Sequence, residues 1–137
     1  MTEQTTRLVL PSQIEAVAEA AAAATDFAQG CGVGEEVVFG IDMAVREAVT
    51  NAVVHGNKED EAKQVEVIFN CLPHSLEIEI KDQGDSFDPK EVPDPTDPAN
   101  ILKTSGRGIF LMRTFMDEVE WSPRPEGGTM VRLVKKF

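Results

Sequence analysis

The stretch REAVTNAVVHGN, residues 46–57, carries two helical patterns at once. Its small apolar residues keep the spacing of a buried helix face, while Glu47, Asn51 and His55 recur four residues apart. A helix turns once per roughly 3.6 residues, so these three polar side chains share one stripe between Ala and Val. A polar stripe taken alone is most often a solvated helix face, but such a face usually carries many Lys, Glu and Gln. The narrow stripe therefore favours a helix that lines a cleft.

Asn51 is the most informative residue of this stripe. Its amide competes for backbone hydrogen bonds, so asparagine is a poor residue for the middle of a helix. One reason to keep it there is to supply an oxygen ligand to a hard cation. Glu47, one turn earlier, is then placed to accept a proton beside that cation. His55 is better explained as a cation-compatible cap at the negative end of the helix.

Composition indicates an ordinary globular protein. The chain has 137 residues, of which 42% are hydrophobic and 27% are charged, and this length fits one domain with a sizeable core. Its net charge of -11 and pI near 4.5 argue against direct binding of nucleic acid, which needs basic patches. An acidic surface instead suits a basic protein partner or a cation-bound ligand.

The cysteines and the amino-terminal residues predict a cytoplasmic location. Cys31 and Cys71 are far apart in the sequence and show no disulfide-framework or metal-binding spacing, which fits a reducing compartment. The first residues, MTEQTTRLVLPSQ, lack a cationic and apolar signal region, and no apolar run reaches membrane length. We therefore expect a cytoplasmic protein that does not enter the membrane.

The order of predicted elements is β-α-α-β-β-loop-α-β-β. Ser12 and Glu15 have the spacing of a capping box, and Gly56 is expected to end the second helix. The predicted strands are RLVL (7–10), VEVIFN (65–70), LEIEIKD (76–82), EVEWS (118–122) and TMVRLVKKF (129–137), and the predicted helices span 13–30, about 35–55 and 109–118. This order predicts an α/β (α+β) two-layer sandwich, in which a mostly antiparallel mixed sheet carries three helices on one face.

Two further motifs carry candidate chemistry. In KDQGD (81–85), Asp82 at a strand end, followed by Gly84, is placed to accept a hydrogen bond from the exocyclic amine of a base; an Asx turn explains the pentapeptide equally well. In SGRG (105–108), two glycines let the backbone approach a ligand, and the helix start offers N–H groups to an anion. Helix capping alone also explains this tetrapeptide. Between the two motifs lies a long Pro- and Asp-rich segment of the kind that usually forms a lid or binding loop.

The combination is more specific than its parts. Glu-x-x-x-Asn on a helix, Asp-x-Gly after a strand, Gly-x-Gly after a long loop and GGT at the start of the last strand together resemble the histidine-kinase-like (GHKL) ATPase superfamily. The segments EAVTNAVVHG, SGRGIFLMRTFMDEVEW and GGTMVRLVKKF are closest to its branch of anti-sigma factor serine/threonine kinases. The resemblance runs from about residue 35 to the C-terminus and implies a Bergerat-type ATP-binding fold, formed by one domain over residues 1–137.

The resemblance implies a role for each matching position. Glu47 is the general base that takes the proton of an attacking serine, and Asn51 is the ligand of the Mg²⁺ that bridges the phosphates. The adenine amine hydrogen-bonds to Asp82 with help from Thr129, beside Gly84. The remaining implied contacts are to the phosphates, from Ser105, Gly106, Arg107 and Gly108, with residues 86–105 as the ATP lid.

The implied function is an ATP- and Mg²⁺-dependent protein-serine kinase. It phosphorylates a STAS-type anti-anti-sigma protein and sequesters an RNA polymerase sigma factor, and a homodimer is compatible with the family. The alternative is a non-catalytic, nucleotide-gated module that only holds its partner. A sensor histidine kinase is less favoured, because no phospho-acceptor helix pair precedes the motifs.

One position departs from the family pattern. The first glycine box usually reads Asp-x-Gly-x-Gly, whereas DQGDS (82–86) has Ser86 at the second glycine. If that position needs positive φ, serine adds strain of about 1 kcal/mol or more. Asp85 also adds a negative charge near the phosphates. We therefore expect reduced nucleotide affinity or an altered lid hinge, and Ser86 favours the non-catalytic alternative.

Overall fold

A five-stranded sheet forms the back layer of the molecule. The computed structural model describes residues 4–57, 60, 62–83, 112–125 and 127–137. The strands β1 (Gln4–Pro11), β2 (Gln64–Leu72), β3 (Ser75–Lys81), β4 (Glu118–Pro123) and β5 (Thr129–Lys136) are arranged in the order β1-β2-β3-β5-β4. All four pairings between these strands are antiparallel. The sheet alternates as predicted: every second residue of β2 from Val65 to Cys71 is buried.

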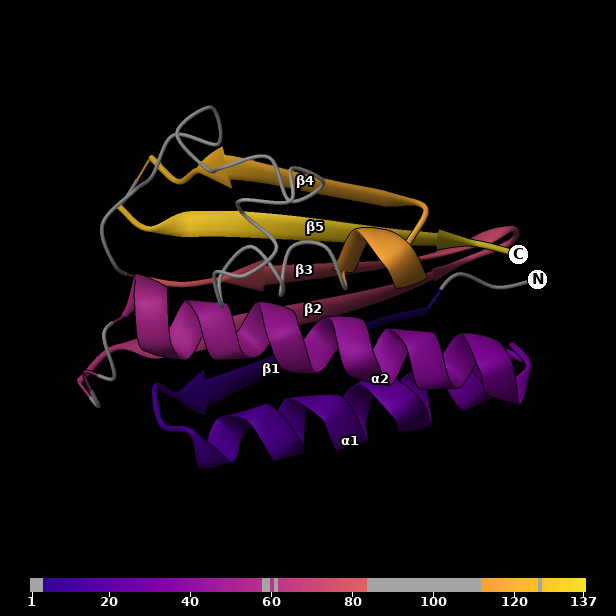
Figure 1. Cartoon of the computed structure of the whole chain (residues 1–137), viewed down its shortest axis with the longest axis horizontal. Coiled ribbons are helices and arrows are strands. Elements are labelled where there is room, and N and C mark those ends of the chain that lie inside the picture. The colour runs from indigo at the N-terminus through magenta and orange to yellow at the C-terminus, as the bar shows by residue number, and fades with distance from the viewer. Residues whose placement is uncertain (1–3, 58–59, 61, 84–111, 126) are drawn as a thin grey trace.

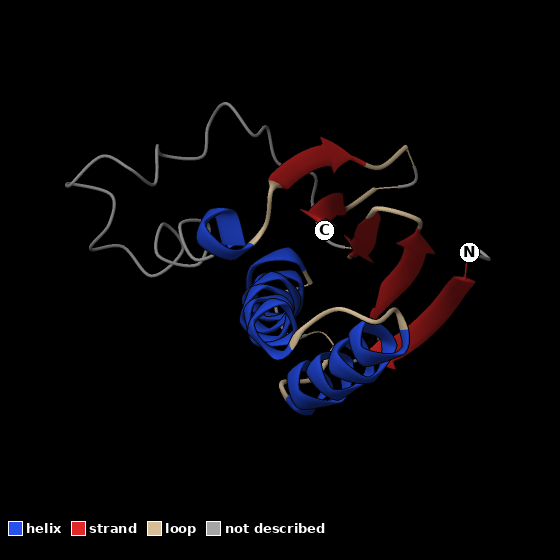
Figure 2. Cartoon of the chain, turned by 90° about the vertical axis from the view of Figure 1, so that its right-hand side faces the viewer, coloured by secondary structure: helices blue, strands red, loops and turns tan. Residues whose placement is uncertain are grey.

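The two long helices form the front layer. Helix α1 (Glu15–Gly30) and helix α2 (Glu35–Thr50) pack side by side against one face of the sheet, as Figures 1 and 2 show. Helix α1 buries alanines four residues apart, which lets it approach its neighbours closely. The predicted core stripe of the second helix is confirmed, because these residues are all buried: Ile41, Val45, Ala48, Val49 and Ala52.

A third helical segment precedes β4. Residues 112–115 are helical, and Phe115 packs on Gly40 of α2, where an added Cβ would meet its ring at 3.1 Å. The remainder of the third predicted helix, towards residue 109, lies outside the described residues. Its predicted end at residue 118 is wrong, because Glu118 already begins β4. The two-layer α+β fold class is confirmed.

Two predicted helix ends differ in the structure. Ser12 does not cap α1: the N-cap residue is Ile14, and the Ser12 hydroxyl is buried with no hydrogen-bond partner among the described residues. The chain turns first, since the Gln13 N–H donates to the Pro11 carbonyl at 2.8 Å. The second helix continues past Thr50 as the π-helix η1 (Asn51–Gly56), and Asn57 rather than Gly56 caps it.

The two cysteines, forty residues apart in sequence, meet in the core. Cys31 caps α1, Cys71 lies in β2, and both are buried free thiols that hydrogen-bond to each other. Burial, together with this hydrogen bond and the charge of Cys71, raises the pKa of Cys31 to about 12. Cys31 is therefore a neutral thiol at ordinary pH.

Candidate functional site

Three elements bring the predicted site residues to one end of the molecule. The helix formed by α2 and η1 ends there, β3 ends there, and β5 begins there (Figure 1). Since β3 and β5 are antiparallel neighbours, the residue after β3 lies beside the first residue of β5. The strand register thus places Asp82 next to Thr129.

Asp82 is a buried carboxylate held by the hairpin that precedes β5. It is only 6% exposed. Its backbone N–H donates to the Thr129 carbonyl at 3.0 Å, and the Thr129 N–H donates to its carboxylate Oδ1 at 3.0 Å. Its own carbonyl accepts a hydrogen bond of 2.6 Å from Nη1 of Arg124. A buried charge is tolerable only when it is bonded in this way, so its orientation is fixed.

Gly128 allows the hairpin to approach Asp82 this closely. It has φ of +95°, and a Cβ built on it would overlap the Asp82 carbonyl oxygen and come within 3.0 Å of the carboxylate. A side chain is therefore excluded by conformation and by space. Gly127 shares the conformation, with φ of +101°, but an added Cβ there meets nothing within 4 Å.

The Thr129 hydroxyl is the atom that points to a ligand. Thr129 is 2% exposed, and among the described residues Oγ1 has no hydrogen-bond partner. Leaving a buried hydroxyl unpaired costs about 1–3 kcal/mol, so such groups are rare unless something else satisfies them. An unpaired hydroxyl beside an oriented carboxylate suits a ligand edge that carries both hydrogen-bond donors and acceptors, as adenine does.

Asn57 links the helix end to the same region. Its side chain is fully buried. Its Oδ1 accepts the Gln83 N–H at 2.7 Å, and its Nδ2 donates to the Gln64 carbonyl at 3.0 Å. The sequence interpretation did not identify Asn57, Arg124 or Gly128 as site residues. A residue that follows a helix-ending glycine looks like part of a turn, and only the fold shows what its side chain contacts.

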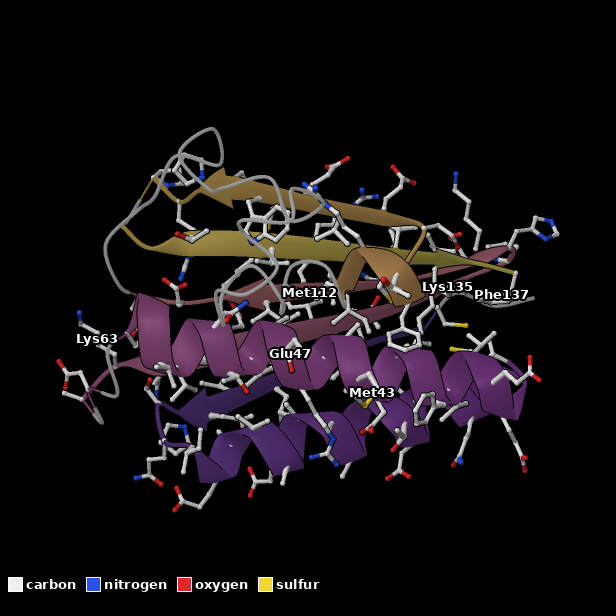
Figure 3. The ribbon with its side chains drawn as sticks, viewed as in Figure 1. Met43, Glu47, Lys63, Met112, Lys135 and Phe137 are labelled. Atoms are coloured by element: carbon white, nitrogen blue, oxygen red, sulfur yellow. The ribbon has the colours of Figure 1, made fainter. Side chains whose placement is uncertain are left out.

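Glu47 and Asn51 supply the other half of the predicted site. Glu47 lies in the last turn of α2, one turn from Met43 on the same side of the helix (Figure 3), and both residues are half-buried. Asn51 is half-buried too and is the first residue of η1, where the α-helix changes to a π-helix. Such π segments frequently occur at functional sites. The α-helix therefore changes to a π-helix partway along the predicted stripe.

Several predicted site residues lie outside the described part of the chain. This group comprises the first glycine-box residues Gly84 and Ser86, the lid at 86–105, and Ser105, Gly106, Arg107 and Gly108. The side chain of His55 is also outside it. Their roles stay predictions.

Comparison with known proteins gives the family. A model described as the histidine kinase-like ATPase domain matches residues 10–135. The chain belongs to the histidine kinase-like ATPase domain family. Family members bind ATP, so Asp82 and Thr129 are the candidate ATP-binding residues of this histidine kinase-like domain.

Relatives of this histidine kinase-like domain are kinases and anti-sigma factors. It is 31% identical over 132 residues to the serine-protein kinase RsbW of Oceanobacillus iheyensis, covering 92% of this chain and 82% of that protein. It is 34% identical over 116 residues to the RsbW of Bacillus subtilis, covering 80% and 72%. It is 36% identical over 135 residues to an anti-sigma F factor of Clostridium botulinum, covering 94% and 90%. The resemblance inferred from the motifs is confirmed.

A solved structure confirms the histidine kinase-like fold. It contains the RsbU and RsbW domains of a Mycobacterium tuberculosis protein, with a TM-score of 0.69 and 17% sequence identity. The match covers 97% of this chain and 32% of that longer one. None of the helices in the described part of the chain is long and apolar enough to cross a bilayer.

Proposed function

We propose that this chain is an anti-sigma regulatory factor that acts as an ATP- and Mg²⁺-dependent protein-serine kinase. The observation that carries the proposal is the buried Asp82 carboxylate beside the Thr129 hydroxyl, which has no partner among the described residues, on a histidine kinase-like fold. The kinase relatives support the reaction, and the anti-sigma relatives support the regulatory role. In this proposal residues 1–137 act as one domain in the cytoplasm.

The described residues divide the work between recognition and chemistry. The Asp82 carboxylate accepts a hydrogen bond from the exocyclic amine of adenine. The Thr129 hydroxyl forms a hydrogen bond with a second polar atom at the same edge of the base. Asn51 offers its amide oxygen to Mg²⁺, a hard cation that prefers oxygen ligands. Bound Mg-ATP supplies the phosphoryl group and the metal charge that neutralises it. Glu47 takes the proton of the attacking serine hydroxyl, one helical turn from Asn51.

The residues outside the described part complete the proposal. Gly84, Ser105, Gly106, Arg107 and Gly108 contact the nucleotide, residues 86–105 cover it, and Ser86 lowers its affinity or alters the hinge. The protein substrate is a STAS-type anti-anti-sigma protein that presents a serine. The second partner is a sigma factor, whose basic DNA-binding surface complements the net charge of -11. The chain acts without direct contact to nucleic acid, and a homodimer is compatible with this scheme.

Transfer of radiolabelled phosphate to a STAS-type protein tests the proposal. Replacing Glu47→Gln removes the base but keeps the shape of the side chain. Transfer should therefore slow by about 10²- to 10⁴-fold. ATP affinity, measured by calorimetry, should hold or rise, because one negative charge near the phosphates is lost. Glu36→Gln, an exposed carboxylate in the first turn of the same helix, is the matched control and should leave both values unchanged.

The same assay decides between the kinase and the non-catalytic module. Wild-type protein that binds a STAS partner in the presence of ATP, yet transfers no phosphate to it, would establish the module and remove the kinase. Ser86 in the first glycine box is the feature that favours this second candidate.

A further inference from the structure

The pairing of β2 with β3 stops one step before it would reach the candidate site. The last pair is Glu66 with Lys81, and the same register would continue with Val65 opposite Asp82 and then Gln64 opposite Gln83. Asp82 bonds to Thr129 on its other side, so Gln83 is the next residue that faces β2. In a continued antiparallel ladder the Gln83 N–H would donate directly to the Gln64 carbonyl. Here it donates to Asn57 Oδ1 at 2.7 Å, and Asn57 Nδ2 donates to that carbonyl at 3.0 Å.

The Asn57 side chain thus lies between the two strands and bridges the Gln64 carbonyl and the Gln83 N–H. An amide side chain carries both a donor and an acceptor, so it can bridge the N–H and the C=O that would otherwise pair. The other half of the missing pair is replaced as well, because the Gln64 N–H donates to the side-chain Oε1 of Gln83 at 2.7 Å. The strands separate at this point without leaving these backbone groups unsatisfied.

The consequence concerns one peptide unit, between Asp82 and Gln83. Its carbonyl, which belongs to Asp82, accepts from Arg124 Nη1 at 2.6 Å. Its N–H, which belongs to Gln83, donates to Asn57 Oδ1 at 2.7 Å. A peptide unit is planar, so two hydrogen bonds at its opposite sides fix its orientation. That orientation in turn limits where the Asp82 side chain can point.

We propose that Asn57 and Arg124 are positioning residues for adenine recognition, which hold the Asp82–Gln83 peptide so that the Asp82 carboxylate faces the exocyclic amine of the base. The inference rests on the proposed function, since it assumes that Asp82 reads adenine. Neither residue contacts the base; each acts through the backbone on either side of the carboxylate. Asn57 comes from the helix end and Arg124 from the β4–β5 hairpin, so the recognition carboxylate is set from both layers of the fold.

Comparing the affinities of two nucleotides distinguishes a role in positioning Asp82 from a role in the stability of the fold alone. ATP carries the exocyclic amine, and purine riboside triphosphate lacks only that group. Calorimetry with Mg²⁺ gives the affinity of each nucleotide, and their ratio measures the amine contact alone. Loss of folded protein lowers both affinities equally and leaves the ratio unchanged.

Asn57→Ala and Arg124→Met should each lower ATP affinity by about tenfold, the loss expected for one misdirected hydrogen bond. Affinity for purine riboside triphosphate should change by less than about twofold, because the contacts to the rest of the nucleotide remain. Asn57→Asp keeps the acceptor for the Gln83 N–H and loses only the donor to Gln64, so it should retain the ratio while lowering the melting temperature. Asn70→Ala, on β2 with its side chain bonded to Thr5, is the matched control and should retain the ratio.

A readout without nucleotide is amide hydrogen exchange of Gln83. It should become faster in Asn57→Ala and remain slow in Asn57→Asp. In an Asp82→Ala background, Asn57→Ala should cause no further change in the nucleotide ratio.

The outcomes are distinguishable. A wild type that binds both nucleotides equally removes the adenine assignment of Asp82, and the proposal with it. A wild type that prefers ATP, together with folded Asn57→Ala and Arg124→Met variants that keep this preference, overturns the positioning role alone. If Asn57→Ala does not fold, Arg124→Met decides, because it releases the other side of the same peptide unit.

Discussion

Two buried hydroxyls of this chain, those of Ser12 and Thr129, lack a partner among the described residues but differ in what surrounds them. Thr129 begins the inner strand β5 beside the Asp82 carboxylate, whereas Ser12 follows the edge strand β1. An unpaired buried hydroxyl lowers the stability of the fold. A protein retains such a group either because a ligand forms a hydrogen bond with it or because no apolar residue has yet replaced it. We assign the first reason to Thr129 only.

Replacing Thr129→Val should separate stability from binding. Valine has the same shape without the hydroxyl, so the free energy of unfolding should stay the same or rise by about 1 kcal/mol. ATP affinity should fall by about tenfold, because the hydroxyl's ligand partner is lost. Urea denaturation and calorimetry measure the two effects. Ser12→Ala should match the stability result and leave ATP affinity unaltered; equal affinities for wild type and Thr129→Val would contradict the assignment.

Asn51 gives a second prediction at the residue scale. If its amide oxygen binds Mg²⁺, Asn51→Ala should bind ATP no better with Mg²⁺ than with EDTA, whereas the wild type should show a clear gain with the metal. Calorimetry under both conditions makes the comparison. A wild type with equal affinity under both conditions would remove the metal from the proposal.

At the scale of elements, the β4–β5 hairpin shows how backbone conformation shapes a site. Gly127 and Gly128 both have positive φ, but an added Cβ would overlap Asp82 at Gly128 and would meet nothing within 4 Å at Gly127. Gly127→Ala should therefore cost only the conformational strain, about 1 kcal/mol. Gly128→Ala adds an overlap with the Asp82 backbone and should cost about 3 kcal/mol or more.

Urea denaturation of the two alanine variants measures this difference directly. The Gly127 variant is the matched control, since it carries the same substitution one residue away. Similar losses of stability in both variants would mean that the close approach of the hairpin to Asp82 is not tightly packed.

Sequence patterns predicted the elements better than their ends. Alternation identified β2 and β3, but β1 begins at Gln4 rather than residue 7, because its polar start is held by pairing with β2. Ser12 and Glu15 have the spacing of a capping box, yet the turn between them places Ile14 at the cap. The spacing of apolar residues did not predict the π-helix. This segment depends on the hydrogen bond from the Asn57 N–H to the Ala52 carbonyl, which the spacing does not reveal.

At the scale of the whole molecule, the sequence could place Asp82 after one strand and Thr129 at the start of another, but not side by side. Their contact depends on the strand order β1-β2-β3-β5-β4, in which β5 lies between β3 and β4. The Asn57 bridge is further removed from sequence, because it depends on where the β2–β3 register stops. The proposed ligand-binding residues could be recognised from sequence motifs. The residues that orient them could be identified only from the three-dimensional structure.

The buried thiol pair also allows opening of the native structure to be measured by the rate at which the thiols are alkylated. With a pKa near 12, Cys31 carries only about one thiolate in ten thousand molecules at pH 8, and thiolate is the form that alkylating reagents attack. Both thiols are also buried, so iodoacetamide should modify native Cys31 and Cys71 only when α1 separates from the sheet. The labelling rate then reports how often that separation occurs. Mass spectrometry should find both cysteines labelled in the same molecules. Labelling should be slower when ATP is bound, because a ligand of the native state makes opening rarer. Rapid labelling of one cysteine alone in the folded protein would contradict this, because that thiol would then be reached without separation of α1 from the sheet.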